Sequence, residues 1–222
     1  MRRAVLPLLL VLLGMALGGC WGQRTRTEEL SPEQIFELAR RAVDKYDYER
    51  AQTLLDQLRD EHPFSKFAVD AELLAADMKF RQDLYEEAAA AYRSFEELHP
   101  THPRAAYAMF RRGMAYLELI HSPDRDQTPS RHAAEAFQKL LYAHPDSEYA
   151  PEARAHLTQV RARLAAHELY VARYYLRKER YDAALARLQG LVRDYPDTPQ
   201  RDEALRLALE VQDRKAATQP EQ

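Results

Sequence analysis

Glycine is scarce in this chain of 222 residues, and most of it lies close to the N-terminus. The sequence contains 6 glycines, and beyond residue 22 only Gly113 and Gly190 remain. Neither a glycine-rich phosphate-binding loop nor a dinucleotide-binding turn occurs, and sheets with tight glycine turns are hard to build from so few residues. The composition therefore favours helices and excludes the common nucleotide-binding enzymes.

Cysteine and metal-binding motifs are also almost absent. Cys20 is the only cysteine, so the chain can form neither an internal disulfide nor a cysteine-based zinc site, and no H-E-x-x-H motif occurs. His62, His99 and His144 each precede a proline at one position of a repeat, which indicates a structural role. The abundant carboxylates are typical of a solvated helical surface. We therefore expect no enzyme activity, no cofactor and no metal.

Basic residues are slightly outnumbered by acidic ones. The chain has 32 lysines and arginines against 35 aspartates and glutamates, a formal net charge of −3. Nucleic-acid binding usually requires a basic patch or stripe, and none is present. Nucleic acid is therefore not an expected partner.

The N-terminal segment has the features of an export signal. Arg2 and Arg3 precede the apolar run Val5–Leu17, which is shorter than the roughly 20 residues of a transmembrane helix and typical of a signal peptide. The run ends in Leu-Gly-Gly-Cys20, which resembles a bacterial lipobox. We predict a lipoprotein signal peptide at 1–19, lipidation of Cys20 and a flexible tether at 20–30. An ordinary signal peptide with a chance cysteine is the alternative.

One pattern of apolar residues occurs four times, each time ending at a proline. The prolines are Pro63, Pro100, Pro145 and Pro196. Twelve residues before each stands an alanine, with large apolar residues four and seven positions after that alanine. This spacing places all three side chains on one helix face, and the proline ends the helix. The pattern predicts an all-α chain of about four helical hairpins over residues 31–215, followed by a polar tail at 216–222.

Capping residues and breakers predict where several helices begin and end. Ser31, Pro32 and Gln34 together form a capping-box signal for the first helix. Hydroxyl residues just past three of the prolines are expected N-caps: Ser65, Ser147 and Thr198. An insertion around His121–Thr128 lengthens the turn of the third hairpin, and Ala150–Lys178 is expected to form one long helix.

The alanine, aromatic and proline positions resemble the tetratricopeptide repeat, with small first-helix residues at Ala39, Ala76, Gly113 and Ala172. This resemblance implies a superhelix whose first helices line the concave face. The groove residues expected there are Phe36, Arg40, Phe80, Arg81, Tyr107 and Phe110. Rings beside guanidinium groups suit a peptide that is rich in aromatic residues and ends in a carboxylate. Packing of these rings between hairpins is the alternative.

Three further segments narrow the resemblance to one family. They are Leu164–Tyr175 with its tyrosine pair, Asp124-Arg-Asp-Gln127 in the insertion, and Arg193-Asp-Tyr-Pro-Asp-Thr198. Together with the lipobox they resemble the BamD (ComL/YfiO) family of lipoproteins of the β-barrel assembly machinery. The resemblance covers essentially the whole mature chain. The chain departs from the family pattern at its last repeat, which we expect to be reduced to a capping helix, Gln200–Lys215.

The family resemblance implies a non-enzymatic scaffold on the periplasmic face of the outer membrane, held there by lipid. Trp21 in place of an aspartate after the cysteine agrees with that membrane. The implied partners are the POTRA domains of BamA, other Bam lipoproteins and unfolded outer-membrane proteins. Arg187, Arg193 and Asp194 are the expected BamA-side residues, with a solvated surface as the alternative for Arg187. A periplasmic repeat lipoprotein that organises cell-wall or division enzymes is the alternative function.

Overall fold

The structure, a computed structural model, describes residues 30–218, and every regular element in this part of the chain is an α-helix. The signal peptide, Cys20, nearly all of the tether and residues 219–222 lie outside the described residues. The helices are α2 (Pro32–Asp44), α3 (Tyr48–Glu61), α4 (Lys66–Arg81), α5 (Tyr85–Leu98), α6 (Ala105–Glu118), α7 (Thr128–Ala143), α8 (Ala150–Arg177), α9 (Tyr181–Asp194) and α10 (Gln200–Thr218).

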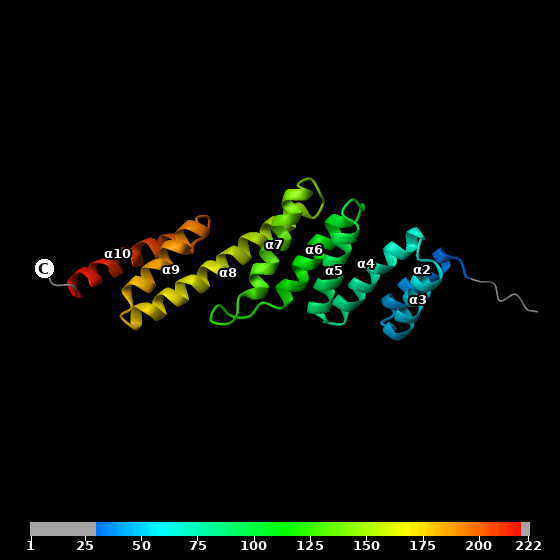
Figure 1. Cartoon of the computed structure of the whole chain (residues 1–222), viewed down its shortest axis with the longest axis horizontal. Helices are drawn as coiled ribbons and strands as arrows, with labels where there is room; N and C mark the ends of the chain where they lie inside the picture. The colour runs from blue at the N-terminus through cyan, green and yellow to red at the C-terminus, as the bar shows by residue number, and fades with distance from the viewer. Residues whose placement is uncertain (1–29, 219–222) are drawn as a thin grey trace, which may run out of the picture.

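The helices pair into hairpins that follow one another along an elongated rod, with α2 and α10 at opposite ends (Figure 1). The hairpins are α2/α3, α4/α5, α6/α7 and α8/α9, and α10 packs on α9 and α8. The all-α repeat prediction is confirmed. The long helix predicted at Ala150–Lys178 is α8, and the capping helix α10 continues past its predicted end to Thr218.

Two of the four predicted N-terminal caps are present, and two are wrong. Ser31 forms the full capping box with Gln34, and Ser65 accepts a hydrogen bond from the N–H of Phe67. Ser147 does not cap α8, because the helix begins later, after Tyr149. A backbone turn ending at Ala150 takes up the intervening residues, and Ser147 Oγ is buried without a hydrogen-bond partner among the described residues. Thr198 does not cap α10, because that helix begins at Gln200 and the Thr198 hydroxyl donates to the carbonyl of Tyr195.

Three of the turns inside the hairpins share a left-handed residue that is not glycine. Tyr46, Asp83 and Glu179 have φ angles of 61°, 59° and 56°. After each of them, the next N–H donates to a carbonyl five residues back, which satisfies a C-terminal carbonyl of the first helix. A chain with little glycine therefore builds its hairpin turns from ordinary residues, at a cost of about 1 kcal/mol each.

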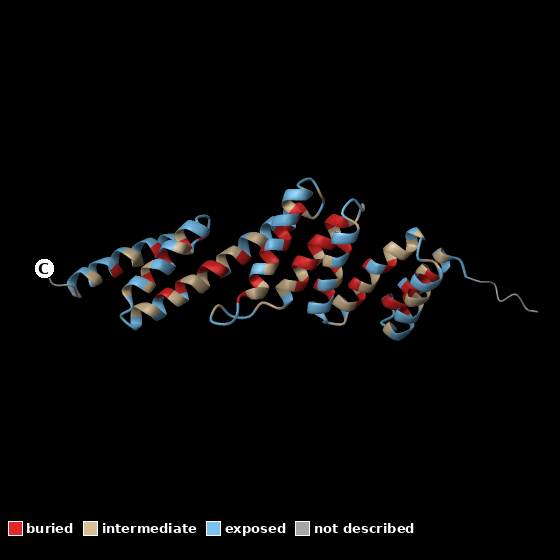
Figure 2. Ribbon diagram, in the orientation of Figure 1, coloured by how far each residue is buried: buried red, intermediate tan, exposed pale blue. Residues whose placement is uncertain are grey.

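The core consists of four clusters spaced along the rod, with buried residues on the helix faces that meet their neighbours (Figure 2). The repeat alanines Ala51, Ala88, Ala133 and Ala184 are all 0% exposed. Gly113 serves the same purpose in α6, since a Cβ there would lie 2.4 Å from a ring carbon of Phe137. Small residues therefore allow the close helix approach that the sequence pattern predicts.

The insertion between α6 and α7 is an ordered loop held against α8. Gln127 is 2% exposed, and its amide donates to the carbonyls of Ser122 and Arg125. From α8, Arg163 donates to the carbonyl of His121. The Asp-Arg-Asp-Gln segment therefore shapes this loop, and the buried side chain of Gln127 stabilises it through hydrogen bonds to its backbone.

None of the helices within residues 30–218 is both long enough and apolar enough to cross a bilayer.

Candidate partner-binding surfaces

The six expected groove residues lie in different surroundings. Phe36 packs on Phe67 at a ring-centroid distance of 5.8 Å, within the first core cluster. Phe110 is 8% exposed and stacks on Tyr149 at 5.3 Å. Arg40 is exposed and pairs with a glutamate of its own helix. Packing in the core, the alternative interpretation, therefore describes Phe110 best.

Arg81 joins the first two hairpins. Its guanidinium lies 3.2 Å from Asp44 at the end of α2, and its backbone carbonyl accepts a hydrogen bond from Tyr48 at 3.4 Å. These contacts explain its position without a ligand.

Phe80 and Tyr107 belong to a polar and aromatic cluster built from three helices. Asp77 of α4 accepts hydrogen bonds from Tyr92 of α5 at 2.6 Å and from Tyr107 of α6 at 2.8 Å. Arg111 donates to the Tyr92 hydroxyl at 3.3 Å, and its guanidinium lies 3.9 Å from the centre of the Phe80 ring. We call these five residues, together with Arg104, the Asp77 cluster.

The electrostatics of the Asp77 cluster keep its tyrosines neutral. Burial, followed by the charge of Asp77, raises the pKa of both Tyr92 and Tyr107. Arg104 and Arg111 approach Asp77 only to 3.8 and 4.0 Å, longer than a charge-assisted hydrogen bond. Their side chains are 42% and 24% exposed, so both cations remain accessible to an anionic group.

The three expected BamA-side residues do lie together. Arg187, Arg193 and Asp194 line one hollow of about 290 Å³ beside α8 and α9. Its other lining residues are Glu168, Ala186, Gly190 and Tyr195. The Arg187 guanidinium lies 3.1 Å from Glu168 of α8, and Arg193 donates to Asp194 at 2.8 Å. We call this surface the α9 face.

The turn below the α9 face is fixed by Arg161 of α8. Its guanidinium donates to Asp197 at 2.9 Å and to the backbone carbonyl of Asp194 at 3.0 Å. The hydrogen bond from Arg161 lowers the pKa of the Asp197 carboxyl. Thr198 closes the same turn by donating to the carbonyl of Tyr195. The Asp-Tyr-Pro-Asp-Thr segment is therefore a structural turn that positions the end of α9.

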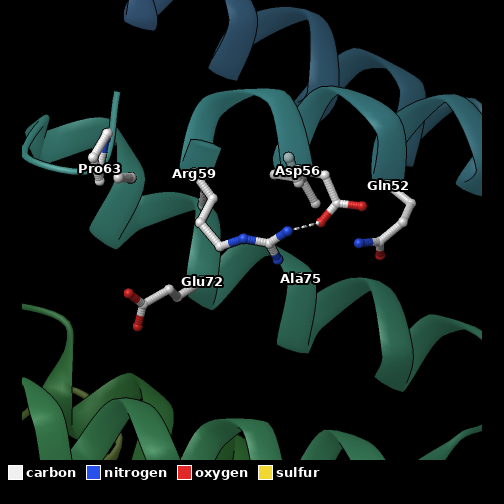
Figure 3. A pocket seen from close by; sticks show the side chains of 9 residues that line it. Gln52, Asp56, Arg59, Pro63, Glu72 and Ala75 are labelled. Carbon is white, nitrogen blue, oxygen red and sulfur yellow. Dashed lines mark ion pairs between the residues drawn. The ribbon is translucent and has the colours of Figure 1, made fainter. Parts of the chain in front are cut away.

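A third surface, which the sequence does not predict, is a groove between α3 and α4 (Figure 3). It has a volume of about 330 Å³. Its floor is apolar, formed by Leu55, Ala68, Ala71 and Ala75. Its charged rim includes Arg59, whose guanidinium extends toward Asp56 at 2.9 Å, and Glu72 on the opposite helix.

Within residues 30–218, no group of three or more histidine, cysteine, aspartate or glutamate side chains is arranged to hold a metal ion. His99 instead lies 3.0 Å from Glu72 and packs on Phe95.

Comparison with known proteins agrees with the repeat architecture. Residues 28–222 match the YfiO family, described as outer membrane lipoprotein. The outer membrane protein assembly factor BamD of Neisseria meningitidis serogroup A is 33% identical over 214 residues, covering 89% of this chain and 80% of the relative. The assembly factor BamD of Vibrio cholerae serotype O1 is 30% identical, covering 88% of this chain and 84% of the relative. The chain therefore belongs to the YfiO family of outer membrane lipoproteins, which includes the BamD assembly factors.

Proposed function

We propose that this protein is a non-enzymatic scaffold of outer-membrane β-barrel assembly. Its family membership over nearly the whole described chain carries this proposal. A rod of helical hairpins suits the task, since it offers a long preformed surface to several partners at once. On this proposal, BamA, other Bam lipoproteins and unfolded outer-membrane proteins bind at different places along the rod.

The α9 face is the proposed contact with the POTRA domains of BamA. Arg187 and Arg193 are 46% and 76% exposed at the edges of a hollow, so each can exchange its present carboxylate for one on a partner. Exposed ion pairs of this kind contribute about 0–1 kcal/mol, and the exchange therefore costs little. Arginine is one of the residue types enriched among the anchors of protein interfaces.

The Asp77 cluster is the proposed site for unfolded outer-membrane proteins. Phe80 and Tyr107 offer aromatic surface, and Arg104 and Arg111 offer accessible cations beside it. A segment that combines a ring with a terminal carboxylate would use both features. This assignment keeps Phe80 and Tyr107 of the expected groove residues. The arginines that border the rings replace the other four, which are Phe36, Arg40, Arg81 and Phe110.

Lipidation at Cys20 is the proposed anchor, which places the protein on the periplasmic face of the outer membrane. Acyl chains contribute about 0.8 kcal/mol per buried CH2, so several chains hold a protein stably. The variant Cys20→Ala should yield an unprocessed or soluble protein in membrane flotation. A processed variant that still floats with membranes would contradict the anchor.

The deciding experiment is affinity purification of the tagged protein from membranes in mild detergent, with partners identified by mass spectrometry. A stoichiometric barrel protein with POTRA domains is the expected result. Recovery of cell-wall or division enzymes in its place would support the alternative function.

Charge reversal then tests the α9 face. Arg187→Glu should reduce recovery of the barrel protein at least tenfold, with unchanged helical content by circular dichroism. Arg214→Glu is the matched control, because Arg214 is a similarly exposed arginine paired with Glu210 on α10, away from the hollow. Equal loss in both variants would mean that the effect is general electrostatics and not the α9 face.

A further inference from the structure

Gly190 lies inside α9 without an internal reason for being glycine. No glycine in the described part of the chain has a positive φ, so the backbone there suits any residue. A Cβ at position 190 would meet only the tip of the Arg193 side chain, at 4.0 Å. Glycine in a helix interior costs about 1 kcal/mol relative to alanine. No contact among residues 30–218 offsets this cost at Gly190.

Gly113, the other glycine in a described helix, shows what such a position does. The ring of Phe137 lies directly on the α6 backbone, and a Cβ would come within 2.4–2.8 Å of three ring carbons. Phe137 is 0% exposed, so this contact is part of the core. A bare stretch of helix backbone in this fold is thus covered by a ring from a neighbouring helix.

The surroundings of Gly190 provide a similar packing site for a side chain, but at the surface of the molecule. Ala186 and Gly190 form the low floor of the 290 Å³ hollow. Arg187 and Arg193 stand three residues before and after Gly190, so their long side chains border the floor on both sides. The floor is apolar and the border is charged, which is the anatomy of a small protein interface.

We propose that Gly190 is a specificity-determining residue of the α9 face, at which an apolar side chain of a partner packs directly on the helix backbone. The matching partner segment carries a ring or branched aliphatic side chain, with a carboxylate beside it for Arg187 or Arg193. This inference rests on the proposed function of the α9 face and adds the feature that selects the partner's shape. The absence of a side chain is here the recognition element.

The test uses the full chain and purified POTRA domains of the partner barrel protein. Gly190→Ala should raise the thermal unfolding midpoint, because alanine favours the helix. It should also weaken binding at least tenfold, because the methyl group occupies the space in which the partner's side chain packs. Gly190→Leu should abolish binding. A merely structural role predicts that stability and binding change in the same direction.

Gln189→Ala is the matched control, since Gln189 is an exposed neighbour on α9 that does not line the hollow. It should bind as the wild type does. If Gly190→Ala and Gly190→Leu also bind as the wild type does while Arg187→Glu fails to bind, the role of Gly190 is wrong and the proposed function stands. If the wild-type protein itself does not bind the POTRA domains, the proposed function fails and this inference with it.

Discussion

The α3/α4 and α5/α6 junctions occupy the same place in consecutive repeats, yet one is hollow and the other is filled. Glu96 and Arg112 stand four residues before and twelve residues after the repeat proline, and their side chains are 0% and 3% exposed, 2.8 Å apart. At the matching positions of the first junction stand Arg59 and Ala75. Ala75 leaves open the space that Arg112 fills, and the side chain of Arg59 is 67% exposed.

The remaining two junctions use a third solution. Leu141 and Leu157 occupy the matching positions between α7 and α8, and both pack against that core. Val192 and Ala208 occupy these positions between α9 and α10, and both pack against the last core cluster. The repeat pattern therefore sets where helices meet, and the residues at two positions decide whether the junction is ionic, apolar or open.

The buried pair at α5/α6 should give the largest effect when broken. Glu96 also contacts Lys139 at 3.0 Å, but its Oε1 and the Nε of Arg112 are too poorly aligned for a hydrogen bond, so their contact is ionic. Arg112→Ala should reduce the free energy of unfolding by about 3–5 kcal/mol, because a buried carboxylate loses its main cation. Urea denaturation measures this change.

The control for that prediction copies the α7/α8 junction. The double variant Glu96→Leu with Arg112→Leu should be close to the wild type in stability or above it, since apolar residues often replace a buried ion pair without loss. A loss as large as that of Arg112→Ala would mean that the ionic pair itself is required for the fold.

A contact inside a hairpin should respond less strongly. Gly113→Ala forces a methyl group against the ring of Phe137, and we expect a loss of roughly 1–3 kcal/mol from overpacking. Thermal unfolding monitored by circular dichroism measures it. An unchanged or higher midpoint would show that the α6/α7 contact is loose.

Filling the open junction should stabilise the chain. Ala75→Leu places apolar atoms over the floor of the groove, and we expect a gain of about 0.5–2 kcal/mol in the free energy of unfolding. The matched variant Ala76→Leu, at a position that is 0% exposed, should destabilise instead. Equal effects of the two substitutions would contradict the difference between groove and core.

The smallest effect is expected at Arg59. Its ion pairs with Asp56 and Asp60 are local and exposed, so Arg59→Ala should leave the unfolding midpoint unchanged within error. Measured beside Arg112→Ala, it compares two arginines in neighbouring junctions. A clear loss of stability would mean that Arg59 closes the groove.

Helix positions could be predicted from the sequence because their signals are local. The repeat alanines, the prolines and the capping box at Ser31 lie within a few residues of the boundaries that they set. Ser147 and Thr198 are the exceptions, since a turn separates each of them from the start of the helix that follows. Local propensity identifies such a residue as a possible cap, but it does not show that a turn lies between the residue and the helix.

The environments of side chains could not be predicted in the same way. Asp77 meets Tyr92 and Tyr107, which lie 15 and 30 residues away. Glu96 and Arg112 belong to different hairpins, and either alone is typical of a solvated surface. Such contacts depend on how one hairpin packs on the next, which no short-range pattern reports. Arg187, Arg193 and Asp194 lie together because they are spaced along one helix.

Helix α8 has a consequence for how the rod can bend. It is one helix of 28 residues, about 42 Å long, and it supplies Val160 and Leu164 to one core cluster and Ala165 and Leu169 to the next. Because α8 packs in both core clusters, the third and fourth hairpins are joined by one continuous helix. We expect them to move together as a rigid body. If the third hairpin tilts, the α9 face is displaced with it, and the displacement increases with distance along α8.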